Sequence, residues 1–238
     1  MNKRNLSLHS FDNRLMDGLL FCKRVYDWFE QIREGPSGKE RLRLRKGQDQ
    51  SEKKLVEELI PIARYIQSRY SPGRRLKVRW MKGNQPFDAR LLSSGGLVDH
   101  GFVPKSQCIE VTTVVHENDH LRRKLLHDGV PTFGVKGISL DQKTKTIVSR
   151  PYGYTNSEAE DELAQKILER LEAKNSIAYP PDTVLVVQCI LDRLFLEDEW
   201  NRSVEQARRV SLEHRFREVF LCDPVHRYSA TLWNVKRP

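Results

Sequence analysis

The sequence lacks several features that would place it in a special class. It contains no run of about 18 apolar residues, so no segment is expected to span a bilayer. The basic start, Met1 to Leu6, is not followed by an apolar stretch, so we expect no secretory signal and predict a cytoplasmic protein. It shows no internal repeat and no low-complexity segment, which excludes collagen-like chains.

Cysteine is scarce and widely spaced. The four cysteines are Cys22, Cys108, Cys189 and Cys222, and none forms a Cys-x-x-Cys pair. This spacing excludes a zinc finger. Because each cysteine has apolar neighbours, we expect reduced thiols in a protein core, as is usual in a cytoplasm.

Charge, in contrast, is plentiful and unbalanced. Of the 238 residues, 41 are Lys or Arg and 32 are Asp or Glu, which gives a formal net charge of +9. Net charge bears on partners rather than on fold. The excess of positive charge favours nucleic acid as a partner, and nothing indicates a membrane. As that partner we expect DNA ahead of RNA. The length suits one domain of generous size with a short appendage.

The first 50 residues are expected to form a helix and a connector. Apolar residues recur at helical spacing from Phe11 to Phe29, with Ser10 as the cap, and the Gly35-Pro36-Ser37-Gly38 segment ends the helix. We expect this helix to pack on the rest of the chain; a homodimer contact is the alternative. Residues 36–50 are polar and basic, and 41–46 could form an edge strand. The predicted parts are therefore an N-terminal extension, 1–50, and a domain, 51–238.

The next segment changes from helical to strand periodicity. Residues 52–70 carry an apolar stripe and predict a helix that is kinked at Pro61. After this helix the apolar period becomes two, which predicts strands at 76–80, 87–92 and 108–115. Because these three strands are consecutive, an antiparallel meander is the simplest arrangement.

The remaining chain alternates helices and strands. The predicted elements are a helix at 119–128, a hairpin at 131–149, a helix from a Ser157/Glu160 capping box to 174, a strand at 183–191, a helix at 200–213, and strands at 216–222 and 228–233. The strand at 183–191 is almost wholly apolar, so both of its faces should be covered. The predicted class is α/β, with a mixed sheet between helical layers.

Two acidic residues on neighbouring predicted strands form the candidate catalytic site. Glu110 and Thr112 share one strand face, and Asp88 lies on the preceding strand, so Asp88 and Glu110 can meet across the sheet. Two neighbouring carboxylates repel each other unless a cation lies between them. Hard oxygen ligands favour Mg²⁺ or Mn²⁺, which can activate water against a phosphoryl group.

This order of strands and acids resembles the PD-(D/E)xK nuclease superfamily, which has the restriction-endonuclease-like fold. Pro86-Phe87-Asp88 stands at the first acidic position of its motif and Glu110-Val111-Thr112 at the second. About three fifths of the chain also resembles bacterial hypothetical proteins of that superfamily, through Asp88, Glu110–Thr113, Tyr179–Thr183 and Phe216–Phe220. The resemblance implies a restriction-endonuclease-like core. It informs the fold more than the function, since no activity is established for that group.

The motif departs from the superfamily at its lysine, which is Thr112 here. A threonine can orient a water molecule but supplies no positive charge. Lys77, Lys124 and Lys136 are the candidates for a lysine that has moved elsewhere. The superfamily often adds a glutamate from the first core helix; Glu58 is the choice here, because it flanks the apolar stripe. The alternative to a metal site is a structural ion network of Asp88 and Glu110 with Arg79 or Arg90.

A second motif, His116-Glu117-Asn118-Asp119-His120, matches the His-Glu-x-x-His pattern of zinc proteases. That pattern requires a continuous helix that brings both imidazoles to one face. Here it follows a predicted strand, and Asn118 and Asp119 favour a helix start between the two histidines. We therefore expect a strand-to-helix turn rather than a zinc site.

A run of cations without an acid extends from Arg69 to Lys82. Within it, Arg74, Arg75, Lys77 and Arg79 are the predicted contacts to a nucleic-acid backbone. Trp80 alternates with the exposed positions and is expected in the core.

The sequence therefore favours a Mg²⁺-dependent enzyme that hydrolyses phosphodiester bonds in nucleic acid. Asp88, Glu110 and Thr112 are the predicted catalytic residues, and Asp88, Glu110 and Glu58 the predicted ligands of Mg²⁺ or Mn²⁺. The first alternative is a catalytically inactive nuclease fold that binds nucleic acid or a protein partner, for example in a defence or toxin system. The second is an interaction protein whose acidic pair is structural.

Overall fold

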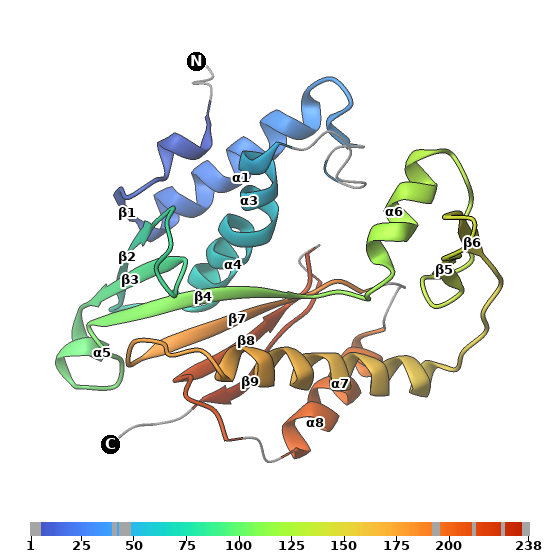
Figure 1. Ribbon diagram of the computed structural model, residues 1–238. Helices are drawn as coiled ribbons and strands as arrows, with labels where there is room; N and C mark the ends of the chain where they lie inside the picture. The colour runs from blue at the N-terminus through green and yellow to red at the C-terminus, as the bar shows by residue number, and fades with distance from the viewer. Residues whose placement is uncertain are drawn as a thin grey trace.

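A mixed seven-stranded sheet forms the centre of the structure, in the order β1-β2-β3-β4-β7-β8-β9 (Figure 1). The computed structural model describes residues 6–39, 42, 49–191, 196–210, 213–224 and 227–234. The pairs β1–β2, β2–β3 and β3–β4 are antiparallel, the pairs β4–β7 and β7–β8 are parallel, and β9 is antiparallel to β8. The strands are β1 (Leu15–Asp17), β2 (Arg75–Trp80), β3 (Ala89–Ser94), β4 (Ser106–Val114), β7 (Thr183–Cys189), β8 (Glu218–Cys222) and β9 (Ser229–Asn234).

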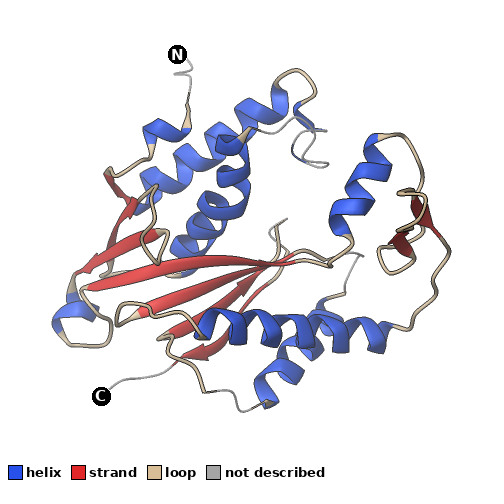
Figure 2. Cartoon of the chain, viewed as in Figure 1, coloured by secondary structure: helices blue, strands red, loops and turns tan. Residues whose placement is uncertain are grey.

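Helices cover both faces of this sheet (Figure 2). On one face α1, α4 and the turn that precedes α4 share an apolar core with the sheet, which includes Phe21, Ile62 and Val78. On the other face α7 and α8 pack over the parallel strands, with Ile167 and Trp200 buried. The helices are α1 (Gly18–Glu34), α3 (Gln50–Lys54), α4 (Ile60–Ser68), α7 (Asn156–Asn175) and α8 (Glu197–Arg209). The predicted α/β class with a mixed sheet between helical layers is confirmed.

The predicted meander of three antiparallel strands, β2-β3-β4, is also confirmed. In β2 every second residue is buried, which is the pattern of a strand with one covered face. All seven residues of β7 are buried, because helices lie on both of its faces. One face of β2 is therefore exposed to solvent, whereas helices cover both faces of the parallel strands at the centre of the sheet.

The N-terminal segment differs from the predicted extension. The expected helix from Ser10 begins only at Gly18, because Leu15–Asp17 forms strand β1 and pairs with β2. The Asp17 carboxylate accepts the Leu19 and Leu20 N–H groups and so caps α1. Phe11 and Phe21 are fully buried in the same core as α4, so residues 6–34 do not pack as an appendage. The possible strand at 41–46 falls on residues outside the described ranges, except Leu42.

A π-helical turn, Leu55–Leu59, joins α3 to α4 and explains how the chain passes Pro61. In a π turn a carbonyl accepts from the fifth residue ahead, and Ile60 N–H donates in this way to the Leu55 carbonyl. Val56 would accept from Pro61, which has no N–H. The Gln188 side-chain amide of β7 instead lies 3.4 Å from the Val56 carbonyl oxygen. The predicted kink at Pro61 is therefore a local change of helix type.

The elements between β4 and α7 lie beyond the end of the sheet (Figure 1). Helix α7 begins two residues earlier than predicted, because Thr155 and Glu158 form the capping box in place of Ser157 and Glu160. The described helices include none that is both long and apolar enough to cross a membrane. The further elements are α5 (Gly96–Asp99), α6 (Asp119–His127), β5 (Ile138–Leu140) and β6 (Ile147–Ser149).

Candidate active site

Asp88, just before β3, lies opposite Glu110 of β4. Ala89 pairs with Ile109, and the same antiparallel register continued by one residue places Asp88, just before β3, across from Glu110. The Asp88 N–H donates to the Ile109 carbonyl at 2.8 Å, and the Asp88 carboxylate accepts the Val111 N–H at 2.8 Å. The structure thus brings together the two acids that the sequence paired.

The electrostatic environment of Asp88 disfavours its charged form. The pKa of Asp88 is raised to about 7, first by burial and then by the nearby Glu110 and Glu58 carboxylates, while the Val111 N–H and Lys174 act against this shift. Burial also raises the pKa of Glu110, although Lys174 opposes this shift. The site therefore holds more negative charge than its neighbours neutralise.

Lys174, near the end of α7, supplies a positive charge that the sequence did not assign. Its ammonium lies 2.6 Å from Glu110 Oε1, and the Tyr179 hydroxyl lies 3.5 Å from the same oxygen. Two of the lysines predicted to replace the motif lysine are Lys77 and Lys124. Both are exposed on other elements and do not contact the Glu110 carboxylate. Lys136 is paired with Glu162 instead.

Glu58 lies near the acidic pair but is held by other residues. It sits in the π-helical turn, where its carboxylate accepts from Trp80 Nε1 at 3.0 Å and from Lys54 at 2.6 Å. Trp80 is buried, as predicted. In the described part of the chain, no group of three or more His, Cys, Asp or Glu side chains is arranged to hold a metal ion. Glu58 therefore does not complete a ligand trio with Asp88 and Glu110.

Thr112 occupies the motif position of the lysine, two residues beyond Glu110 on β4, and is buried. Residues two apart on a strand share a face, so Thr112 and Glu110 both point toward the side of the sheet that α7 covers. Lys174 thus brings to this face the charge that Thr112 lacks.

The predicted basic contacts divide into buried and exposed residues. Arg74 is buried and donates to Ser93 Oγ at 3.1 Å, so its assignment to a nucleic-acid surface is wrong. Side chains two residues apart on a strand point to the same face, so Arg74 lies on the buried face with Leu76, Val78 and Trp80. Arg75, Lys77 and Arg79 are exposed on the open face of β2, and Arg79 pairs with the exposed Arg90 of β3. We call these four exposed residues the basic strand face.

The His-Glu-x-x-His segment forms the expected strand-to-helix turn. Asn118 is the N-cap residue of α6, so the helix begins between the two histidines. His116 Nδ1 accepts the Asn118 N–H at 3.1 Å, and its Nε2 lies 3.5 Å from Glu162 Oε1. His120 Nδ1 is 2.7 Å from the Glu117 carbonyl oxygen. Neither histidine is oriented as a zinc-protease ligand.

No protein-family model matches this chain, and no curated protein or solved structure matches it at a significant level. Function must therefore be inferred from the chemistry of the site itself.

Proposed function

We propose that the protein is a metal-dependent nuclease with a restriction-endonuclease-like core. The observation that carries this proposal is the facing pair Asp88 and Glu110, with the Lys174 ammonium 2.6 Å from Glu110. The order of the sheet supports it, since an antiparallel meander with acids on its second and third strands leads into two parallel strands. Lys174 then stands in for the motif lysine that Thr112 replaces.

The carboxylate oxygens of Asp88 and Glu110 can supply part of the coordination shell of a magnesium or manganese ion. Mg²⁺ is often held by one or two carboxylates, and water and substrate phosphate complete its coordination. Asp88 and Glu110 are carboxylates of this kind, and burial, followed by the charges of Glu110 and Glu58, raises the pKa of Asp88, so its charged form is disfavoured unless a cation is bound. When bound, such an ion would activate water and stabilise charge on the phosphoryl group.

The chain's own residues have separable roles in this proposal. Asp88 and Glu110 hold the ion. Lys174 places a positive charge where the scissile phosphate gains negative charge, and Thr112 orients the attacking water. The basic strand face lies on the same side of the sheet as Glu110, because β2 buries its other face. Four cations on the same side of the sheet as the acidic pair suit the backbone of a nucleic acid, and we propose DNA ahead of RNA.

A cleavage assay tests the proposal directly. Labelled DNA and RNA are incubated with Mn²⁺ or with EDTA, using wild type, Lys174→Met and Thr112→Val. We expect cleavage only with the ion, a loss of about 100-fold or more in Lys174→Met, and a smaller loss in Thr112→Val. Equal cleavage by wild type and Lys174→Met would remove Lys174 from the mechanism. Cleavage that persists in EDTA would remove the ion.

One observation favours a second candidate, an inactive nuclease fold that binds nucleic acid or a protein partner. The Glu110 carboxylate is already neutralised by Lys174, as in a structural ion pair. Such a protein would still bind its partner in EDTA and would cleave nothing.

Binding of nucleic acid should depend on the basic strand face. We expect Arg75→Gln, Lys77→Gln and Arg79→Gln together to weaken DNA binding and to lower the salt slope of log K by about 0.9 for each lost phosphate contact. Titrations at several salt concentrations in EDTA measure this slope. Arg24→Gln, which removes a cation from α1, is the control, and an unchanged slope in the triple variant would exclude this face.

A further inference from the structure

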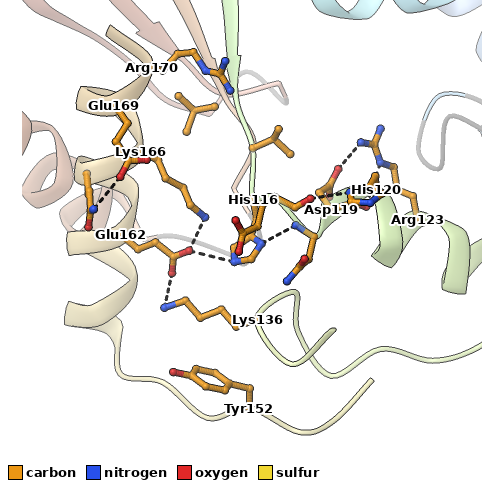
Figure 3. A pocket seen from close by; sticks show the side chains of 15 residues that line it. His116, Asp119, His120, Arg123, Lys136, Tyr152, Glu162, Lys166, Glu169 and Arg170 are labelled. Atoms are coloured by element: carbon orange, nitrogen blue, oxygen red, sulfur yellow. Dashed lines mark hydrogen bonds and ion pairs between the residues drawn. The ribbon is translucent and has the colours of Figure 1, made fainter. Parts of the chain in front are cut away.

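A large pocket lies beyond the end of β4, between α6, the segment before β5, and α7 (Figure 3). Its volume is about 880 Å³. Pockets of about 300 to 1,000 Å³ hold small molecules or single chemical groups of larger ligands. The basic side chains that line it are Arg123, Lys136, Lys166 and Arg170.

A partly buried network of ion pairs holds two of these cations in place. The Glu162 carboxylate of α7 lies 2.7 Å from the Lys136 ammonium and 2.5 Å from that of Lys166 (Figure 3). His116 is buried beside it, and both of its ring nitrogens are engaged by Glu162 and the Asn118 N–H. One carboxylate thus meets two ammonium groups, which leaves one positive charge at this point of the wall.

Asp119 forms a similar arrangement on the opposite wall. It accepts from both Arg122 and Arg123, at 2.5 and 2.7 Å. The lining also includes the exposed acids Glu117 and Glu169, so the pocket is not uniformly positive. What favours an anion is that the Glu162 carboxylate is shared by two ammonium groups, those of Lys136 and Lys166, whose remaining N–H groups can bind further acceptors.

Three cations on α7 connect this pocket with the candidate active site. Lys166, Arg170 and Lys174 follow one another at intervals of four residues, so they lie along one side of the helix at steps of about 6 Å. Lys174 contacts Glu110 at one end, and Lys166 lies in the pocket at the other. Arg170, between them, is exposed and forms no ion pair with any residue that the structure describes.

The pocket also offers an aromatic ring. Tyr152 is 47% exposed, and the Lys136 ammonium lies 5.7 Å from its ring centroid. Exposed aromatic rings stack on bases regardless of base identity. A ring and a row of cations are the two elements from which binding sites for single-stranded nucleic acid are built.

We infer that this pocket binds one nucleotide of a single-stranded segment next to the cleavage position. Arg170 and Lys166 hold the phosphates, and Tyr152 stacks on the base. The inference rests on the proposed function, which makes the bound strand the substrate of the nuclease. It adds a preference for single-stranded over duplex substrate, because a pocket of about 880 Å³ admits a nucleotide but not a duplex.

Binding of a single-stranded DNA octanucleotide, measured by fluorescence anisotropy in EDTA, tests the inference without requiring cleavage. The variants are Arg170→Gln and Tyr152→Leu, with Arg209→Gln as a matched loss of one exposed arginine on α8. We expect about tenfold weaker binding in each pocket variant, and a salt slope about 0.7 smaller in Arg170→Gln. A duplex of the same sequence should lose much less affinity, and Arg209→Gln should match wild type.

The outcome is separable from that of the proposed function. If wild type cleaves nothing but the pocket variants lose affinity as expected, the nuclease proposal fails, and the pocket stands as a binding site for single-stranded DNA. If wild type cleaves DNA but Arg170→Gln and Tyr152→Leu bind the octanucleotide like Arg209→Gln, the pocket inference is overturned. Failure of wild type to bind the octanucleotide would also overturn it.

Discussion

Asp88→Asn is expected to raise the melting temperature of the protein in EDTA at pH 8 and to abolish its stabilisation by Mn²⁺. Asp88 is the acid of the site that forms no ion pair with a described residue, and its pKa is raised to about 7, chiefly by burial and then by Glu110 and Glu58. Asparagine keeps an oxygen that can accept the Val111 N–H and removes the charge. The gain should be on the order of a few kcal/mol, or roughly 5 °C or more in melting temperature.

The pH dependence of this gain has a definite sign. An unfolded aspartate titrates near about 3.9, so between that pH and about 7 the folded wild type binds more protons than the unfolded chain. Its free energy of unfolding therefore falls as the pH rises through this interval. Asparagine does not titrate, so the advantage of Asp88→Asn should grow from pH 4 to pH 7 and then level off.

Mn²⁺ should stabilise wild type, because it binds the folded acidic pair. At a concentration of one hundred times the dissociation constant the gain is about 2.7 kcal/mol, which corresponds to roughly 5–10 °C. The effect should be larger at pH 8 than at pH 5.5, since the ion requires ionised Asp88. Thermal unfolding with EDTA and with Mn²⁺ measures both effects.

Glu110→Gln provides the contrasting variant. It should also abolish the Mn²⁺ shift, but it should lower the melting temperature in EDTA, because it breaks the 2.6 Å pair with Lys174. Asp99→Asn, an exposed residue of α5, is the control and should behave like wild type. No Mn²⁺ shift in wild type, together with a large loss of stability in Asp88→Asn, would identify the acidic pair as structural.

Periodicity and register explain why much of this site was predictable. The strands that carry Asp88 and Glu110 alternate apolar and polar residues, and consecutive strands pair by default. Those two rules alone bring the acids together. The alternation of a strand also separates Arg74 from Arg75. Arg74 lies two residues before the buried Leu76 and is buried with it, whereas Arg75 points to the exposed face.

Contacts that depend on how distant elements dock were not predictable in the same way. Lys174 is 64 residues from Glu110, and its role follows from the position of α7 across β4. No local pattern distinguishes it from the other lysines. The pocket at His116 arises in the same way, since Glu162 and Lys136 meet His116 only after α7 and the segment before β5 have packed.

Deletion of residues 1–34 is expected to leave a chain that does not fold cooperatively. The deleted part contains β1 and α1, and its buried side chains include Phe11, Phe21, Val25 and Trp28. The Phe11 ring packs 5.7 Å from those of both Phe21 and Trp28. Loss of one buried phenylalanine costs about 3–5 kcal/mol, and a whole domain is stable by only about 5–15 kcal/mol. The deletion would also expose the inner surface of α4 and leave β2 as an unpaired edge.

Two point variants keep this last prediction testable when the truncated chain is insoluble. Phe21→Ala should lower the free energy of unfolding by about 3–5 kcal/mol, because the ring is fully buried between α1 and the rest of the core. Leu19→Ala, on the same helix but 52% exposed, should lower it by less than about 1 kcal/mol. Urea denaturation followed by circular dichroism measures the difference. Equal stabilities for the two variants, or a cooperative transition in the truncated chain, would show that α1 is an appendage and not part of the core.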